Sequence, residues 1–163
     1  LDYTGAMKAW IQRVSRGRVT VDGRNCGEIG PGAVVFLGVR QGDTDAAACA
    51  LAERTVHLRI FADADGRMNR SILESGGSVL VISQFTLYAD TRKGNRPSFT
   101  EAEEPVAARG RYDAYVAALR SRLGSDRVAT GAFRAVMQID LQHDGPVSIE
   151  LRTRGESENR RAG

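Results

Sequence analysis

Residues 78–88 read Ser-Val-Leu-Val-Ile-Ser-Gln-Phe-Thr-Leu-Tyr, and this stretch decides the fold because it joins a buried strand to a polar segment. Residues 79–82 are a continuous apolar run, which is typical of a strand covered on both faces. A Gly-Gly pair at 76–77 precedes the run and predicts a turn. The run Ser83-Gln84-Phe85-Thr86 then places hydroxyl and amide groups at the mouth of this strand. From these residues alone, a strand end at which Phe85 and Leu87 pack and the polar side chains face water is the simpler interpretation.

Further strands are predicted on both sides of this stretch. Residues 7–14 and 18–21 alternate apolar and polar side chains, which is the period of a half-buried strand. The Asp22-Gly23 pair that follows is a hairpin signal, because glycine tolerates the positive φ that such turns require. Residues 33–39 are continuously apolar and predict another strand buried on both faces. Three short β segments are expected to close the domain, at 126–130, 135–141 and 146–152.

Two helices are predicted between the strands. The first begins at Asp43 or Thr44, whose side-chain oxygens can cap it. The second begins near Pro105 and ends at Gly124. Each has an apolar stripe at spacings of three and four residues: Ala48, Leu51, Ala52, Thr55 and Val56 in the first, and Tyr112, Tyr115, Val116, Leu119 and Leu123 in the second. The polar stretch 89–104 is a loop long enough to be functional or disordered.

These elements predict one α+β domain over residues 7–152. Two helices cannot cover both faces of six to eight mostly antiparallel strands, so a sheet curled into a barrel, with the helices packed outside it, is the simplest architecture. Residues 1–6 are interpreted as an extension or cloning remnant, and residues 153–163 as a flexible charged tail.

Composition limits the classes of function. The 163 residues carry a net charge of +3, and two of those charges lie in residues 152–163, whereas a duplex-binding protein has a basic face. Cys26 and Cys49 have no CxxC spacing and are expected to be free thiols of a cytoplasmic protein. No apolar run approaches the roughly 18–20 residues of a membrane span, so we expect no membrane partner.

Conventional catalytic and metal-binding motifs are absent from the sequence. It contains no G-x-S-x-G, no H-E-x-x-H and no Walker loop. His57 lies on the flank of the first helix's apolar stripe and is expected to be structural. His143 adjoins Asp144, and one such pair offers too few ligands for zinc. We therefore expect neither a metal site nor a cofactor.

A series of short segments supports a more specific interpretation. In chain order they are Ile11-Gln12-Arg13-Val14, Gly66-Arg67-Met68-Asn69, Gly76-Gly77-Ser78-Val79-Leu80-Val81, Ser83-Gln84-Phe85-Thr86-Leu87, Ala89-Asp90-Thr91, Arg96-Pro97-Ser98-Phe99, Thr130-Gly131-x-Phe133, Met137-Gln138-Ile139 and Asp144-Gly145-Pro146-Val147. In these segments and their order, the chain resembles the D-aminoacyl-tRNA deacylase family over roughly residues 7–151. The resemblance implies a barrel, a homodimer, and hydrolysis of D-aminoacyl-tRNA to a free D-amino acid and tRNA.

The resemblance also implies roles for the polar segment. Ser83, Gln84, Phe85 and Thr86 would line the pocket of the aminoacyl ester, with backbone N–H groups near Phe85 and Thr86 polarising its carbonyl. The 2′-hydroxyl of the tRNA's 3′-terminal adenosine would assist, which fits a chain without a recognisable triad. Thr86 as a covalent nucleophile is the alternative, although no general base adjoins it in sequence.

Selectivity is implied to come from the second motif. A cis Gly145-Pro146 bond of one subunit would project into the other subunit's pocket and collide with an L side chain. Arg13 would hold this wedge, with Met137 nearby. Glycyl-tRNA, including tRNA-Ala mischarged with glycine, has no side chain to refuse and would be a residual substrate. From the residues alone, a turn before the last strand explains Gly145-Pro146 equally well.

Two departures from the family and two other classes of function remain. The family usually has Asn and Thr where this chain has His143 and Ser148; Ser148 keeps a hydroxyl, and His143 introduces a group that can titrate near neutrality.

A non-catalytic nucleic-acid module would use the loop cations Arg92, Lys93 and Arg96, although Asp90, Glu101, Glu103 and Glu104 offset them; DNA is not expected as a partner. An esterase of small D-amino acid compounds would need no RNA.

Overall fold

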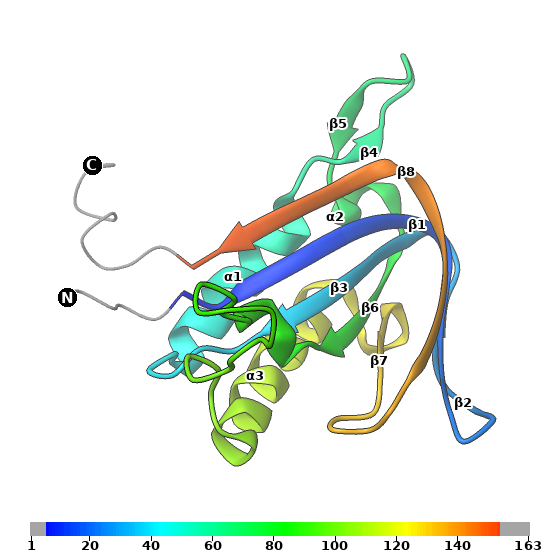
Figure 1. Ribbon diagram of the computed structural model, residues 1–163. Coiled ribbons are helices and arrows are strands. Elements are labelled where there is room, and N and C mark those ends of the chain that lie inside the picture. The colour runs from blue at the N-terminus through cyan, green and yellow to red at the C-terminus, as the bar shows by residue number, and fades with distance from the viewer. Residues whose placement is uncertain (1–5, 154–163) are drawn as a thin grey trace, which may run out of the picture.

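The fold is built around one long strand, β1. The computed structural model describes residues 6–153, in which β1 pairs with three other strands of a six-stranded sheet (Figure 1). The sheet order is β2-β1-β3-β6-β7, and β8 lies along the remaining edge of β1. The strands are β1 (Lys8–Val21), β2 (Arg24–Ile29), β3 (Gly32–Gly38), β6 (Ser78–Ser83), β7 (Val128–Thr130) and β8 (Gln138–Arg152). Residues 1–5 and 154–163, which include most of the predicted extension and charged tail, lie outside the described residues.

β1 is a single bent strand, so the prediction of two separate segments at 7–14 and 18–21 is wrong. Its first half, residues 8–14, pairs with β3, and its second half, residues 17–21, pairs with β2. The register with β8 shifts on both sides of Val14, and these irregularities interrupt the alternation that the sequence prediction relied on. The hairpin at Asp22-Gly23 is confirmed, since both residues have positive φ.

The sheet is mixed. The three pairings of β1 are antiparallel, as predicted, whereas β3 pairs with β6 and β6 pairs with β7 in parallel. Parallel neighbours need crossover connections, and the two predicted helices lie in those crossovers. The predicted segments 135–141 and 146–152 are likewise one strand, β8.

Glycine allows the sheet to curl almost into a barrel. A Cβ atom on Gly27 of β2 would lie 2.3 Å from the backbone oxygen of Thr130 in β7. No side chain fits in that space, so only a glycine lets the two ends of the sheet approach so closely. The curled sheet that the sequence predicted is therefore confirmed.

Both long helices pack on one face of the sheet. They are α1 (Asp45–His57), capped by the Thr44 side chain, and α3 (Pro105–Leu123), which ends at Gly124 with a φ of +89°. The buried residues of both helices are those of the predicted apolar stripes. A short third helix, α2 (Ile72–Ser75), and the small hairpin β4 (Phe61–Ala62) and β5 (Met68–Arg70) were not predicted. Among the described residues, no helix is both long and apolar enough to span a membrane.

The two faces of the sheet have separate apolar cores. The helix-facing core includes Ile11, Val35 and Val81, together with the buried faces of α1 and α3. The concave core lies on the opposite face, inside the curl, and comprises Val14, Val19, Ile29, Val34, Leu80 and Ile82. Because side chains alternate along a strand, Phe36 and Trp10 continue the concave face towards the open end of the curl.

Candidate functional site

The polar segment predicted at the end of β6 forms a turn of 3₁₀ helix, η1 (Phe85–Tyr88). The N–H of Gln84 donates to the carbonyl of Leu37 at 2.8 Å, which fastens the start of η1 to β3. The next residue, Gly38, makes this contact possible. A Cβ atom there would lie 2.9 Å from the Tyr88 ring and 3.3 Å from the Gln84 carbonyl oxygen.

The other end of η1 is held by Lys8 and Tyr88. The Lys8 ammonium donates to the carbonyl of Leu87 at 3.1 Å and lies 4.8 Å from the centre of the Tyr88 ring. The Tyr88 hydroxyl donates to the carbonyls of Ala6 and Gly38. Burial raises the pKa of Tyr88, and the nearby Asp43 charge raises it further, so the phenol is neutral and acts as a donor.

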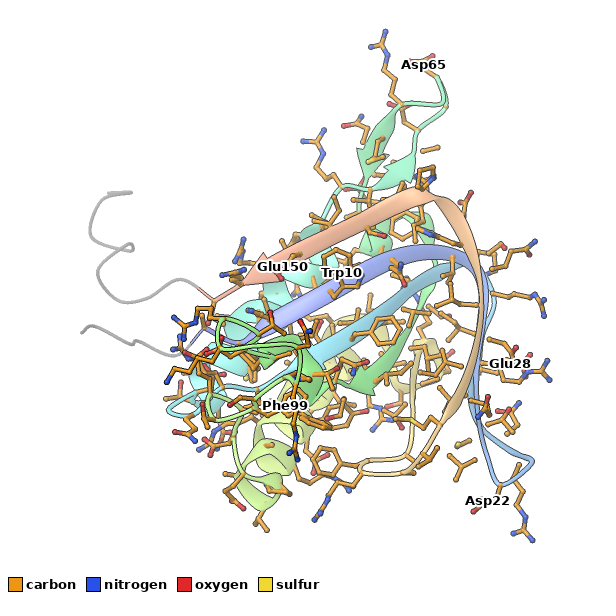
Figure 2. All side chains as sticks on the ribbon, viewed as in Figure 1. Trp10, Asp22, Glu28, Asp65, Phe99 and Glu150 are labelled. Atoms are coloured by element: carbon orange, nitrogen blue, oxygen red, sulfur yellow. The ribbon has the colours of Figure 1, made fainter. Side chains whose placement is uncertain are left out.

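A hollow opens beside η1 at the open end of the concave face. Its volume is about 450 Å³, within the roughly 300–1,000 Å³ usual for small-molecule sites, and it is lined by Trp10, Phe36, Gln84, Thr86 and Leu87. Phe85 is 56% exposed, and its ring packs edge-on against that of Phe99, with centroids 4.9 Å apart. Trp10 and Phe99 lie on the same side of the molecule in Figure 2.

The polar groups beside the hollow are mostly donors. The Gln84 amide donates to the hydroxyl oxygen of Thr86. Within residues 6–153, the backbone N–H groups of Phe85 and Thr86 have no hydrogen-bond acceptor. An N–H pair of this kind can stabilise negative charge on a carbonyl oxygen. No described histidine or carboxylate contacts the Thr86 hydroxyl, so a general base for that group is missing from this part of the chain.

The second predicted motif is an irregular excursion of β8. Gln12 of β1 pairs with Ser148, but Val14, only two residues on, pairs with His143. Five residues of β8 therefore span the distance of two in β1, and residues 144–146 are exposed outside the ladder. The Gly145–Pro146 peptide bond is cis. These two residues belong to β8 itself and not to a turn before it.

Polar side chains brace this excursion from two sides. Arg13 donates from Nε to the carbonyl of Asp144 at 2.9 Å and from a terminal nitrogen to the carbonyl of Ile60 at 2.7 Å. Its Nε also lies 3.2 Å from the Asp144 carboxylate. The His143 ring nitrogen Nε2 lies 3.0 Å from the N–H and 2.9 Å from the carbonyl of Val147. The His143 side chain thus links the two ends of the excursion, residues 143 and 147.

The structure does not join the two motifs within one copy of the chain. No hydrogen bond, ion pair or ring contact among the described residues connects residues 83–86 with Gly145–Pro146. Met137 packs against Gly131 and the concave core. Its predicted place beside the wedge thus stays a prediction, as do the substrate-binding roles of the other site residues.

Sequence reasoning missed the apolar part of the site. Trp10 and Phe36 line the hollow, and Lys8 holds η1, yet none of them was predicted to belong to a site. The sequence signal that could have indicated this part of the site was the tryptophan at position 10, in a strand with alternating apolar and polar residues. Trp10 is 36% exposed, which fits a large ring at the edge of a core. Within the described residues, no three His, Cys, Asp or Glu side chains gather where a metal ion could bind.

Comparison with known proteins assigns the family. The profile of the D-Tyr-tRNA(Tyr) deacylase family matches residues 10–152. A D-aminoacyl-tRNA deacylase of Heliobacterium modesticaldum is 55% identical over 149 residues, covering 91% of this chain and 98% of that protein. One of Azoarcus sp. is 53% identical over 146 residues, covering 90% and 95%.

Solved structures show the same fold. One described as a c-Myc DNA Unwinding Element Binding Protein superposes with a TM-score of 0.84 at 37% identity, covering 88% of this chain and 97% of that one. A probable eukaryotic D-amino acid tRNA deacylase superposes with a TM-score of 0.79 at 17% identity, covering 90% and 99%. The fold and these relatives define the chain as a hydrolase of ester bonds. It belongs to the D-Tyr-tRNA(Tyr) deacylase family.

Proposed function

We propose that the chain hydrolyses the ester bond of D-aminoacyl-tRNA and refuses L-aminoacyl-tRNA. The observation that carries the proposal is the pair of N–H groups at Phe85 and Thr86, which have no acceptor among residues 6–153 and lie at the rim of a hollow with an aromatic wall. The family and its D-aminoacyl-tRNA deacylase relatives supply the substrate class. An RNA substrate used in translation places the reaction in the cytoplasm.

The reaction needs positioning more than a strong nucleophile. An aminoacyl ester is already labile in water, so aligned donors and a held carbonyl can supply much of the catalysis. The 3′-terminal adenosine enters the hollow, and the ester carbonyl points at the two N–H groups. Gln84 orients the Thr86 hydroxyl, and the adenosine's own 2′-hydroxyl assists the attack on the ester. The reaction requires neither a cofactor nor a metal.

Thr86 as a covalent nucleophile is the competing mechanism for the same reaction. It is disfavoured because the Thr86 hydroxyl accepts from Gln84 and contacts no base in the described part of the chain. The variant Thr86→Ala separates the two mechanisms. We expect deacylation of D-Tyr-tRNA to fall by less than about 10³, a step worth roughly 4 kcal/mol. A larger fall, together with a trapped acyl-enzyme, would establish the nucleophile.

Selection against L residues comes from a second copy of the chain. Among the described residues, the exposed excursion at Gly145–Pro146 forms no hydrogen bond, ion pair or ring contact with residues 83–86 of its own copy, and a two-fold dimer would let each excursion enter the partner's hollow. Main chain suits this role because it cannot rotate away from a side chain as another side chain would. Glycyl-tRNA, including tRNA-Ala mischarged with glycine, has no side chain with which the excursion could collide, and it is a residual substrate.

The test is the ratio of two rates. Purified protein is incubated with D-Tyr-tRNA and with L-Tyr-tRNA, and release of the amino acid is followed at equal enzyme concentration. We expect fast release of D-Tyr and release of L-Tyr close to the uncatalysed rate. Equal rates on the two substrates would overturn the proposal. Sedimentation in the same buffer checks the dimer.

Two further substrates separate the rival classes. An esterase of small compounds would hydrolyse a D-tyrosine methyl ester as readily as D-Tyr-tRNA, whereas the proposed enzyme leaves it almost untouched because it lacks the ribose hydroxyl. A nucleic-acid module would bind DNA or RNA with strong salt dependence and show no turnover. The name of the 37% identical relative makes duplex DNA the appropriate binding probe in this arm.

A further inference from the structure

The loop that follows η1 folds back as an arch beside the hollow. Asp90 and Ser98 form an antiparallel bridge with backbone hydrogen bonds of 2.7 and 2.9 Å, which closes residues 91–97 into an exposed arch. The residue after the bridge is Phe99, whose ring packs on Phe85. The cationic arch, as we name residues 90–98, is therefore continuous with η1 at one end and packed against it at the other.

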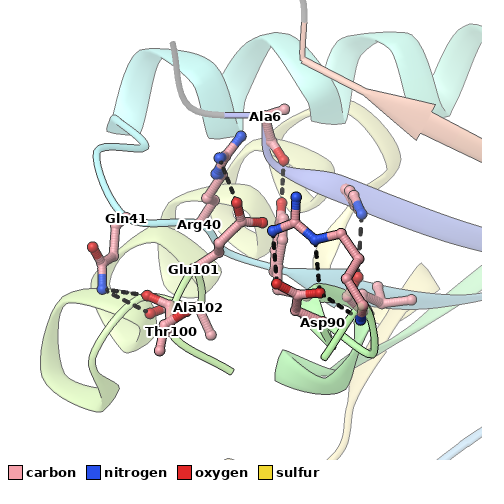
Figure 3. Close-up of polar contacts among 11 residues, drawn as sticks. Ala6, Arg40, Gln41, Asp90, Thr100, Glu101 and Ala102 are labelled. Atoms are coloured by element: carbon pink, nitrogen blue, oxygen red, sulfur yellow. Dashed lines mark hydrogen bonds and ion pairs between the residues drawn. The ribbon is translucent and has the colours of Figure 1, made fainter. Parts of the chain in front are cut away.

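Asp90 offsets one positive charge of the arch, whereas Glu101 and Glu104, which the sequence also suggested would offset its charge, bind groups outside it. Asp90 accepts from the Arg92 guanidinium at 2.9 and 2.7 Å, and these bonds hold the pKa of its carboxyl below its usual range. Glu101 forms an ion pair with Arg40 at 3.0 Å, and Figure 3 shows both acids with their partners. Glu104 accepts from two backbone N–H groups as the cap of α3.

The arch has three cations and one acid, so it keeps a net charge of +2, although the Lys93 charge also acts on the Asp90 carboxylate. Lys93 and Arg96 are exposed, and neither forms a hydrogen bond or an ion pair with any residue in the range 6–153. They lie within ten residues of Thr86 along a segment whose two ends are both fixed beside η1. Two positive charges without an ion-pair partner in this range thus lie on a loop that is anchored at η1, near the exposed Phe85 ring and the partly buried Phe99 ring that packs on it.

We propose that Lys93 and Arg96 bind backbone phosphates in the unpaired 3′ end of the RNA substrate, and so hold the terminal nucleoside over the hollow. This inference rests on the proposed function. Proteins that bind single-stranded nucleic acid combine cations that follow the backbone with aromatic side chains on which bases stack, and both elements are present here. The arch binds the substrate's polyanionic part and takes no part in breaking the ester.

The test compares two substrates that share the ester and differ in phosphate. One is D-Tyr-tRNA, and the other is the 3′-D-tyrosyl ester of adenosine, which carries no phosphate. For Lys93→Gln/Arg96→Gln, we expect KM for D-Tyr-tRNA to rise about tenfold at low salt, with kcat unchanged. The slope of log(kcat/KM) against log[salt] should become shallower by about 1.4, since each phosphate contact on a single strand contributes about 0.7. Hydrolysis of the adenosine ester should not change.

A control variant removes the same charge at a distance. Arg24→Gln/Arg120→Gln also loses two cations. Arg24 begins β2. Arg120 lies fifteen residues from the first residue of α3, which is about 22 Å from the end of that helix nearest in sequence to the arch. We expect this variant to keep the wild-type KM and salt slope.

Each outcome of the experiment is distinct. An unchanged KM and slope in the arch variant, or an equal change in the control, would overturn the phosphate assignment while leaving the proposed function intact. Loss of activity on the adenosine ester would mean that the arch acts in the chemical step, which also contradicts the inference. Absence of hydrolysis of both substrates by the wild type would instead be a failure of the proposed function.

Discussion

The two segments proposed to act on the substrate are held by different kinds of contact. Residues 83–88 are fastened by a main-chain bond to β3 and by the close approach of Gly38. Residues 143–147 stand outside the β8 ladder and are braced by the polar side chains of Arg13 and His143. The donors for the reacting carbonyl are thus positioned by main-chain bonds and close packing on either side of them, whereas the excursion is positioned by exposed hydrogen bonds.

This difference predicts that the two regions respond differently to substitution. Changes behind η1 should cost global stability and impair hydrolysis of every substrate. Changes around the excursion should leave stability nearly unaltered and alter the ratio of D to L hydrolysis. Free energy of unfolding and the D/L ratio are therefore the two measurements that test the comparison.

The largest effect on stability is expected for Gly38→Ala. The new methyl group would meet the Tyr88 ring at 2.9 Å and the Leu87 Cβ at 3.1 Å, and the backbone of η1 must shift to admit it. Overpacking of this kind costs about 1–3 kcal/mol, which urea unfolding can measure. Gly30→Ala is the matched control, because no atom lies within 4 Å of its Cβ position. If the two variants were equally stable, close packing behind η1 would not hold the segment.

An intermediate effect is expected from Asp43, which lies behind η1. Burial raises its pKa to about 6, although its carboxylate accepts from the N–H of Arg40 at 2.6 Å. Between about pH 4 and 6 the folded chain binds more protons at this group than the unfolded chain, so its contribution to stability falls as pH rises through that window. Above pH 6 the buried charge destabilises the fold by an amount on the order of 1 kcal/mol.

The measurement is the difference in unfolding free energy between pH 4.5 and pH 7, in the wild type and in Asp43→Asn. We expect the amide variant to lack the part of the pH dependence that favours low pH. Asp63 and Asp90, whose pKa values are lowered by hydrogen bonds, act in the opposite direction and are present in both proteins. Identical pH profiles would show that Asp43 carries no such charge penalty.

The smallest effect on stability, and a clear one on selectivity, is expected for His143→Ala. Nε2 of His143 either accepts from the Val147 N–H or, when protonated, donates to the Val147 carbonyl, so removing the ring takes one hydrogen bond from the exposed excursion and loosens it. The unfolding free energy should change by less than about 0.5 kcal/mol. The D/L ratio should fall about five- to tenfold, the scale of one hydrogen bond.

His143→Asn is the informative partner variant, because it restores the residue usual in the family. Its amide can still bond within the excursion, so we expect the D/L ratio to stay near that of the wild type. A loss of stability without a change in the ratio, in either variant, would mean that His143 supports the strand and does not position the excursion.

Local patterns predicted the parts of the fold that local physics determines. The apolar run at 79–82, the stripe of α3 and its end at Gly124 all follow from side-chain periodicity and glycine geometry, and all are confirmed. The bend of β1 and the parallel pairing of β3 with β6 depend on contacts far apart in sequence. No pattern within a dozen residues carries that information.

The candidate site shows the same division. The polar run at 83–86 stood out because it follows directly on a buried apolar run, and the Gly145–Pro146 pair because glycine and proline are uncommon inside strands. Trp10 and Phe36 looked like ordinary core residues, because nothing in their neighbours shows that the concave face opens beside them. That Lys93 and Arg96 have no ion-pair partner within residues 6–153 also needed the structure, since the glutamates that follow them in sequence bind other groups.

The first half of β1 sets the spacing between η1 and the excursion of β8. Lys8 holds the end of η1, Trp10 walls the hollow, and Arg13 fastens the excursion. Even and odd positions of β1 face opposite sides of the sheet. A single residue inserted between Trp10 and Arg13 would therefore turn one of these two side chains to the opposite face of the sheet. The number of residues along the first half of β1 should therefore stay the same among homologues, even where loops away from the site differ in length.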